Sequence, residues 1–261
     1  MAPPPAAPPT LLLTRPRPQA GAWLQRLQAL GVVARSLPLI EIVPADDADP
    51  ARAAWAGLPQ AALAMFVSPN AVTHFFAARP PGQGWPADTL AATVGPGSAQ
   101  ALREAGVPAA QIVQPPPDAP SLDSEHLWPL LAVRDWQGRL ALVIRGAGGR
   151  DWLAERLRER GARVRDVSVY QRRCPRLEPG ERALLAAALA APAAHVWLFS
   201  SAEALGHLQT LAGAPVDWSQ ARAIATHARI AERARALGFG HVVLARPEAA
   251  AVAQALQGPQ G

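Results

Sequence analysis

The chain of 261 residues contains no lysine, because all 25 of its basic residues are arginine. A Schiff base on a lysine side chain, and with it lysine-tethered pyridoxal phosphate, is therefore excluded. The formal net charge is only +5, and the arginines are scattered, whereas a nucleic-acid-binding chain would show basic runs with aromatic residues between them. We expect no nucleic-acid partner and interpret most arginines as solvated helix faces.

Cysteine and tyrosine are almost absent too. Cys174 is the only cysteine, so an internal disulfide is impossible, and this usage fits a reducing compartment. The six histidines show no metal-ligand spacing and have no cysteine partners, so we interpret them as surface or core residues and expect no metal site. Tyr170 is the only tyrosine. It is either a packing residue with a satisfied hydroxyl or, in a cleft, a proton donor.

Long hydrophobic runs are missing as well. Residues 1–9 are mostly proline and alanine without a basic start, which is unlike a secretory signal and predicts a disordered tail. The longest uncharged stretch, 183–202, contains Pro192 and His195 and reads better as a helix, a loop and a strand than as a membrane span. The chain is therefore expected to be cytoplasmic, with no membrane partner.

What the chain does contain is an internal repeat. The apolar run 11–13 leads to Arg15, the run 141–144 leads to Arg145, and each continues into a helix-like stretch that ends in glycine. Arg145 lies 130 positions after Arg15, as Gly161 does after Gly31. We call these stretches repeats A and A′, and two such strand–helix–strand units predict two similar lobes with a ligand cleft between them.

A second pair of similar segments, repeats B and B′, lies between and after the first pair. In each, an apolar strand ends in serine and a helix begins, at Ser68 and again at Ser201, 133 positions later. Strands and helices alternate throughout, which predicts an α/β fold with parallel sheets. The expected strands are 11–14, 37–43, 64–67, 90–94, 112–113, 140–144, 164–170, 196–199, 223–225 and 241–244. The expected helices include 22–30, 71–78, 98–105, 152–160, 202–211 and 229–237. The segments 44–50, 114–120 and 174–180 read as connections.

Serines that follow parallel strands are candidate ligand contacts, because ligands bind outside the carboxyl ends of such strands. Ser68 and Ser201 also stand where helix N-caps belong, and capping alone would explain them. The loop 95–99, which has two glycines and Ser98, opens a further helix. Backbone amides at such helix starts attract anions.

The segment 145–149 must also be weighed as a dinucleotide-binding loop. Gly146 and Gly148 fit the glycine spacing, and Asp166 lies 20 positions beyond Gly146. The third glycine position is Asp151, however, whose carboxylate would stand near the pyrophosphate. A nicotinamide oxidoreductase therefore stays open as a third reading, testable by whether NAD raises the melting temperature.

Taken in order, these motifs resemble the uroporphyrinogen-III synthase family from about Leu11 to Leu256. Each motif is modest alone, and their order and spacing make the resemblance specific. The motifs are Thr14-Arg15-Pro16, Leu30-Gly31, Leu37-Pro38-Leu39-Ile40-Glu41-Ile42, Phe66-Val67-Ser68-Pro69-Asn70-Ala71-Val72, Val94-Gly95-Pro96-Gly97-Ser98-Ala99, Arg145-Gly146-Ala147-Gly148-Gly149 and Val169-Tyr170-Gln171-Arg172.

The resemblance implies two flavodoxin-like α/β domains with parallel sheets, joined by a two-strand linker. Repeat A would pack with B′ and B with A′, so the first domain is discontinuous. The implied ranges are 10–40 with 174–261 for domain 1, 44–167 for domain 2, and 37–43 and 167–173 for the linker strands.

The resemblance also implies a lyase of heme biosynthesis. It would cyclise hydroxymethylbilane to uroporphyrinogen III, with inversion of ring D and loss of water, and would need no cofactor. We expect a monomer that receives its substrate from the preceding pathway enzyme. The alternative is a non-catalytic two-lobed binding protein for a polyanionic small molecule.

By the same resemblance, Tyr170 assists departure of the substrate hydroxyl. The residues expected along the substrate are Arg15, Ser68, Asn70, Ala71, Ser98, Arg145, Gly146, Ser200, Ser201 and Thr226. One loop departs from the family pattern: 225–230 lacks a glycine and has Ile230 where a hydroxyl is expected. Thr226 or Arg229 would have to substitute.

Overall fold

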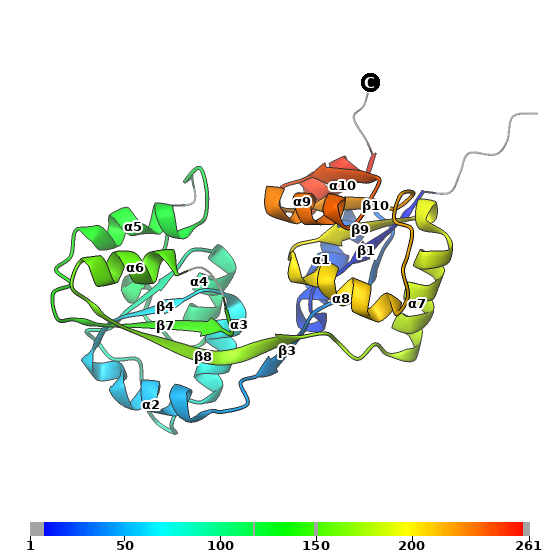
Figure 1. Cartoon of the computed structure of the whole chain (residues 1–261). Helices are drawn as coiled ribbons and strands as arrows, with labels where there is room; N and C mark the ends of the chain where they lie inside the picture. The colour runs from blue at the N-terminus through cyan, green and yellow to red at the C-terminus, as the bar shows by residue number, and fades with distance from the viewer. Residues whose placement is uncertain (1–7, 117, 149–150, 258–261) are drawn as a thin grey trace, which may run out of the picture. The chain divides into compact units, whose positions relative to one another are not determined.

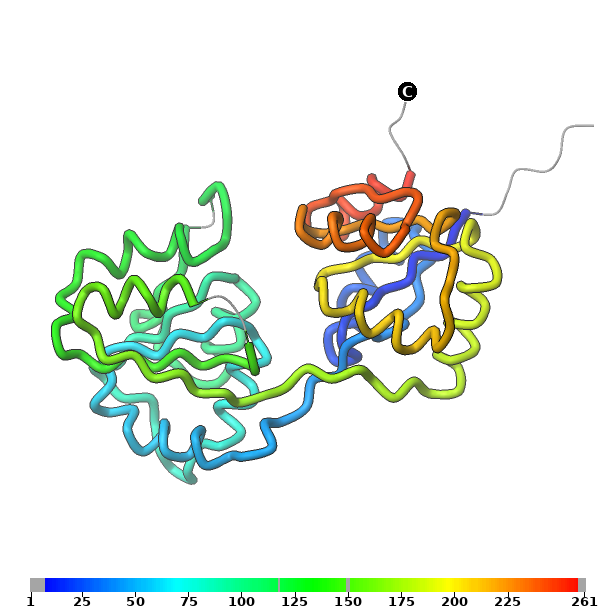
Figure 2. Tube along the Cα trace, viewed as in Figure 1, coloured from blue at the N-terminus to red at the C-terminus, as the bar shows by residue number. Residues whose placement is uncertain are grey.

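The computed structural model describes residues 8–116, 118–148 and 151–257 (Figure 1). Most of the predicted tail, and Gly149 at the end of the predicted glycine loop, lie outside these residues. The described chain forms two compact units. Unit 1 comprises the residues up to Glu41 and those from Arg173 on, and unit 2 comprises Ile42–Arg172. Figure 2 traces how the chain leaves unit 1, builds the whole of unit 2 and returns.

Unit 1 is built on a five-stranded sheet in which every pairing is parallel. The strand order is β11-β10-β9-β1-β2. The strands are β1 (Thr10–Leu13), β2 (Ala34–Ser36), β9 (His195–Phe199), β10 (Arg222–Ala225) and β11 (His241–Leu244). The helices are α1 (Arg17–Ala29), α7 (Pro179–Ala190), α8 (Glu203–Ala212), α9 (Ala228–Ala236) and α10 (Ala249–Gln257), with a 3₁₀ turn η3 (Pro192–Ala194).

Unit 2 has a six-stranded sheet of order β3-β8-β7-β4-β5-β6, in which β4 to β8 pair in parallel. Its strands are β3 (Glu41–Pro44), β4 (Ala61–Phe66), β5 (Leu90–Thr93), β6 (Ile112–Val113), β7 (Leu140–Gly146) and β8 (Arg163–Arg173). The helices are α2 (Asp49–Gly57), α3 (Pro69–Ala77), α4 (Pro96–Glu104), α5 (Ser124–Ala132) and α6 (Trp152–Glu159), with 3₁₀ turns η1 (Leu58–Gln60) and η2 (Ala109–Gln111).

The two sheets have the same arrangement of strands in space, but the chain begins at a different strand of that arrangement in each unit. The order β11-β10-β9-β1-β2 of unit 1 matches β6-β5-β4-β7-β8 of unit 2 strand by strand. Counted along the chain, unit 1 has the flavodoxin-like order 2-1-3-4-5 and unit 2 has 3-2-1-4-5, so the units are circular permutations of one another. The predicted α/β class with parallel sheets is confirmed. In each sheet the connections change direction once, between β1 and β9 and between β4 and β7, and ligands bind at such switch points.

The central strands of each sheet, β1 and β9 in unit 1 and β4 and β7 in unit 2, are buried on both faces, which explains why they are continuously apolar. Leu11 and Leu13 face α1 and α10, where Trp23 and Val252 are buried with them. The helices α7, α8 and α9 lie on the other face (Figure 1). In unit 2 the aromatic rings of Trp55 and Phe75 stack with centroids 4.8 Å apart. Each such aromatic side chain buries a large apolar area.

The predicted strand over 37–43 is wrong in part. Leu37–Ile40 are buried but belong to no strand, and they separate β2 from β3. Pro38 has no N–H to donate to a ladder, and the amides of Leu37 and Leu39 bond instead to the carbonyls of Leu13 and Thr14.

The predicted connection over 44–50 contains the start of α2. The Asp47 carboxylate accepts the amide of Asp49, 2.8 Å away, at the first residue of this helix. The sequence expectations named no helix at α2, α5 or α10. Where the chain passes between the units, β3 and β8 are neighbours in one sheet.

Candidate functional site

The residues expected to bind substrate lie at the carboxyl ends of parallel strands, in two sets. In unit 2, β4 is followed by Ser68, Asn70 and Ala71, β5 by Ser98, and β7 ends in Arg145 and Gly146. In unit 1, β1 is followed by Arg15, β9 by Ser200 and Ser201, and β10 by Thr226. Each set therefore lies at the carboxyl ends of the strands of its own sheet, which is where α/β proteins bind ligands. We call this end of each sheet its ligand edge.

Tyr170 lies near the end of β8 and its side chain is fully buried, with 0% exposed. Its hydroxyl is 3.1 Å from the Ser68 hydroxyl and accepts a hydrogen bond from Arg172 Nη2 at 3.2 Å. The Arg172 guanidinium carbon also lies 5.6 Å from the tyrosine ring centroid, and the His74 ring stacks on the tyrosine with centroids 5.8 Å apart. Burial lowers the pKa of His74, which favours its neutral form.

Arg172 and His74 were not singled out from the sequence. The signal for Arg172 was available, because residues i and i+2 of a strand share a face. His74 lies one helical turn beyond Ser68–Asn70 on α3, but a lone histidine on a helix says nothing by itself about a tyrosine about a hundred residues away.

The backbone at Gly146 packs closely against the ring of Tyr170. A Cβ at position 146 would lie 2.6 Å from both Cε2 and Cζ of the tyrosine ring. Carbon atoms in contact are usually about 3.5–4.0 Å apart. Glycine is thus required here by the ring, and Gly146 serves the site by seating Tyr170.

Arg145 was expected to be a charge partner of the substrate, and the structure argues against this role. Its side chain is buried and forms ion pairs with Asp151 and Asp166, the latter at 3.0 Å, while its Nε donates to the Gly148 carbonyl. Burial lowers the pKa of Arg145, but its hydrogen bonds and ion pairs with Asp151 and Asp166 outweigh this effect, so the pKa is raised. Because Arg158 also contacts Asp166, at 3.3 Å, that carboxylate is not free to bind a ribose either, which weakens the dinucleotide reading.

Arg15, at the matching position of repeat A, has the opposite environment. Its Nε is buried with no hydrogen-bond partner, and its guanidinium lies 4.5 Å from the centroid of the Trp23 ring. Burial lowers the pKa of Arg15, although arginine stays protonated at neutral pH. A buried donor without a partner costs about 1–3 kcal/mol, so Arg15 is suited to a carboxylate ligand.

The hydroxyls expected along the substrate are partly used in capping. The Ser68 hydroxyl accepts the Ala71 amide at 3.2 Å, so this amide, expected to contact substrate, is engaged within the helix. Ser201 accepts the amide of Glu203 at 3.2 Å, although the N-cap position of α8 is Ala202. Ser98 is buried in the first turn of α4, whereas Asn70 is half-buried.

The atypical loop at 225–230 contains the two residues expected to substitute for the missing hydroxyl, Thr226 and Arg229. Ile230 is buried, and His227 caps α9 by accepting the Arg229 amide at 3.2 Å. Thr226 is half-buried and its amide donates to the Phe199 carbonyl at 3.0 Å, next to Ser200. The backbone of Thr226 thus lies beside the end of β9, and we keep Thr226 as a candidate substrate contact.

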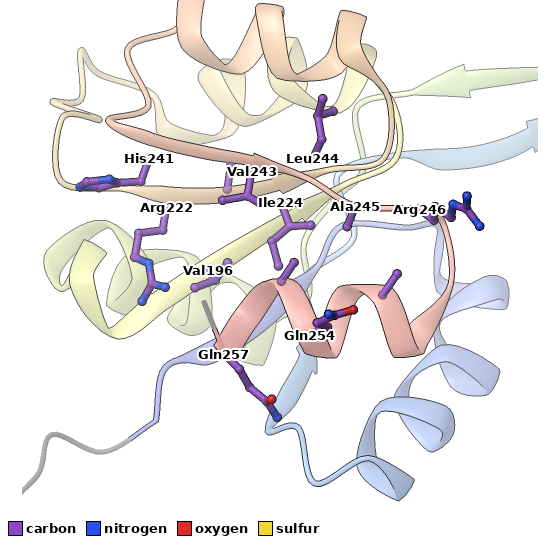
Figure 3. A pocket seen from close by; sticks show the side chains of 13 residues that line it. Val196, Arg222, Ile224, His241, Val243, Leu244, Ala245, Arg246, Gln254 and Gln257 are labelled. Carbon is purple, nitrogen blue, oxygen red and sulfur yellow. The ribbon is translucent and has the colours of Figure 1, made fainter. Parts of the chain in front are cut away.

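A cavity of about 1090 Å³ lies elsewhere in unit 1, between β10, β11 and α10 (Figure 3). It contains none of the predicted site residues, and its two arginines, Arg222 and Arg246, lie at opposite ends (Figure 3). Polar groups that converge on one point are the mark of a ligand site, so the cavity is not the candidate site. Among the described residues no cluster of His, Cys, Asp and Glu could hold a metal ion, and no helix there could span a membrane.

Two doubly wound units, with hydroxyls and an arginine whose buried Nε has no hydrogen-bond partner at the carboxyl ends of their strands, define a two-domain α/β protein that acts on an anionic small molecule. A family model described as uroporphyrinogen-III synthase HemD matches residues 21–254. The chain therefore belongs to the uroporphyrinogen-III synthase family. The predicted family, its function and its enzyme class, a cyclising lyase of heme biosynthesis, are thereby confirmed.

Relatives and solved structures agree. Over 179 residues, or 67% of this chain and 70% of the relative, the chain is 35% identical to uroporphyrinogen-III synthase of Salmonella typhimurium. It is 30% identical to that of Escherichia coli over 176 residues, again 67% and 70%. A crystal structure of a mutant uroporphyrinogen III synthase from Thermus thermophilus matches with a TM-score of 0.58 at 20% identity, over 95% of this chain and 97% of that one. A structure from Helicobacter pylori matches with a TM-score of 0.57 at 15% identity, over 95% and 99%. These two structures support the fold.

Proposed function

We propose that this chain cyclises hydroxymethylbilane to uroporphyrinogen III, with inversion of ring D and loss of water. The observation that carries the proposal is the cluster of Ser68, Tyr170 and Arg172 at the ligand edge of unit 2, in a chain of this family. A tyrosine whose hydroxyl contacts a serine and an arginine is suited to act as a general acid that assists departure of a substrate hydroxyl.

The remaining task of the site is to hold a flexible polyanion. Loss of the hydroxyl produces an electrophilic azafulvene that the terminal ring's own carbons attack, through a spiro intermediate. Rate enhancement then comes from positioning and charge placement. Arg15, with its unpartnered donor, and the half-buried Ser200, Ser201 and Thr226 are proposed to bind carboxylates in unit 1. We propose Asn70 and Ser98 for the same role in unit 2, and assign Arg145 to the fold.

The test supplies hydroxymethylbilane to the purified chain and identifies the isomer formed. We expect isomer III, whereas isomer I alone, which forms spontaneously, would contradict the proposal. Tyr170→Phe is expected to slow turnover at least tenfold without abolishing it. An unchanged rate in that variant would remove Tyr170 from the mechanism and leave the overall function standing.

Compartment, assembly and supply of substrate are part of the same proposal. We propose a cytoplasmic monomer that accepts its substrate from the preceding enzyme of the pathway. Size-exclusion chromatography with light scattering tests the oligomeric state. Mixing the two enzymes and measuring how much isomer I escapes tests the handover, because direct transfer keeps isomer I low.

A further inference from the structure

The hydroxyl of Tyr170 is inside the protein. The tyrosine is 0% exposed and packs in one core cluster with Phe66 and Val169. Ser68, its hydrogen-bond neighbour at 3.1 Å, is half-buried at the start of α3. Of the two hydroxyls, the one that a ligand can reach is therefore that of Ser68.

The hydrogen bonds of this cluster have a definite direction. Arginine has donors only, so the Tyr170 oxygen accepts from Arg172. If Ser68 also donated to Tyr170, the phenolic proton would have no acceptor among the described atoms and would be buried unpaired, at a cost of about 1–3 kcal/mol. The satisfied arrangement has Tyr170 donate to Ser68, which also accepts the Ala71 amide. Both lone pairs of the serine oxygen are then occupied, and its own proton points away from the cluster.

From this we infer that Ser68 donates a proton to the departing hydroxyl, that Tyr170 then donates its own proton to Ser68, and that Arg172 positions Tyr170. The inference rests on the proposed function. As the substrate C–O bond breaks, the Ser68 proton moves to the leaving oxygen and forms water, and the Tyr170 proton moves to Ser68. The resulting phenolate accepts a charge-assisted hydrogen bond from Arg172. The attacking pyrrole loses a proton when the macrocycle closes, and this proton returns along the same path, so the cycle balances.

Variants of Ser68 separate this role from helix capping. Ser68→Ala removes both the cap and the relay. Ser68→Asn keeps a good N-cap, because asparagine caps about as well as serine, but it has no hydroxyl proton to give. Ser68→Thr keeps both. We expect kcat to fall at least tenfold in the alanine and asparagine variants and to be largely retained in the threonine variant. Asp123→Ala, which removes the cap of α5 in the same unit, should weaken stability similarly and leave kcat unchanged.

The double variant Ser68→Ala/Tyr170→Phe tests whether the two residues share one path. On one path the double variant is about as slow as the slower single variant, whereas independent roles multiply the two losses. Multiplied losses, or a wild-type kcat in Ser68→Asn, would overturn the relay while isomer III is still made. If the wild-type chain itself makes no isomer III, the proposed function fails instead, so the two failures are distinguishable.

Arg172 acts through Tyr170 and is a positioning residue. Arg172→Met removes the donors and keeps much of the length, and it should lower kcat several-fold with little change in KM. Arg172→Lys, which restores a charged donor, should recover part of the loss. An effect of Arg172→Met on KM alone would show that this arginine binds substrate, and would contradict its place in the relay.

Discussion

Replacing Gly146 by alanine tests the geometry of the Tyr170 site most directly. The new Cβ would lie 2.6 Å from Cε2 and Cζ of the tyrosine ring, against an ordinary carbon contact of about 3.5–4.0 Å. The ring must therefore move by about 1 Å. A shift of that size away from Ser68 would take the Tyr170 hydroxyl, now 3.1 Å from the serine hydroxyl, beyond hydrogen-bond range.

The expected effect is twofold. Overpacking of a buried site costs about 2 kcal/mol, which lowers the Tm by roughly 4–8 °C for a chain of this size. Misplacement of a catalytic group by about 1 Å can lower the rate up to about a hundredfold, so kcat should fall by at least tenfold while KM changes little.

The assays are thermal unfolding and the rate of isomer III formation. Gly21→Ala is the matched control, because no atom lies within 4 Å of its added Cβ and the site is in the middle of α1. That variant should be more stable by about 1 kcal/mol and have the wild-type kcat. If Gly146→Ala left both Tm and kcat unchanged, the close approach of Gly146 to Tyr170 and its role in seating the ring would be refuted.

Three further changes test the remaining assignments. Arg15→Gln should raise KM several-fold with little loss of stability, because the arginine has a buried Nε without a partner; an unchanged KM would exclude it from substrate binding. Arg145→Gln should lower stability, since it removes the ion pairs of the buried arginine with two largely exposed carboxylates, and an unaltered Tm would contradict this. Hydrogen bonds from Ser121 and His126 outweigh the effect of burial and lower the pKa of Asp123 to about 2. Its contribution to stability is thus present above pH 4 and lost as the pH falls toward 2, and Asp123→Ala should remove that part of the acid dependence in urea unfolding.

The sequence predicted the sheets well because their signal is local. Runs such as 11–13 and 141–144 are buried on both faces and stay apolar throughout, and the spacing of the glycines that follow revealed the repeat. The strand over 37–43 was mispredicted because Leu37 and Leu39 are fully buried without being in a strand. A hydrophobic pattern indicates that residues are buried, but buried residues need not pair with a neighbouring strand.

The site was less predictable, for a related reason. Arg15 and Arg145 occupy equivalent positions of the repeat, and no local pattern distinguishes them. Their roles diverge because two carboxylates, Asp151 and Asp166, reach Arg145, while Arg15 meets the face of Trp23. Similarly, the sequence indicated Tyr170 but not its burial, which depends on how closely the backbone at Gly146 packs against its ring.

The circular permutation of the two units has a consequence for synthesis on the ribosome. Strand β1, with its fully buried leucines Leu11, Leu12 and Leu13, lies between β2 and β9 in the finished sheet. Strand β9 begins only at His195, so at 5–20 residues per second β1 waits on the order of ten seconds or more for its partner. All of unit 2 emerges in that interval. Strand β1 is thus made before unit 2 but gains its second neighbouring strand only after unit 2 is complete.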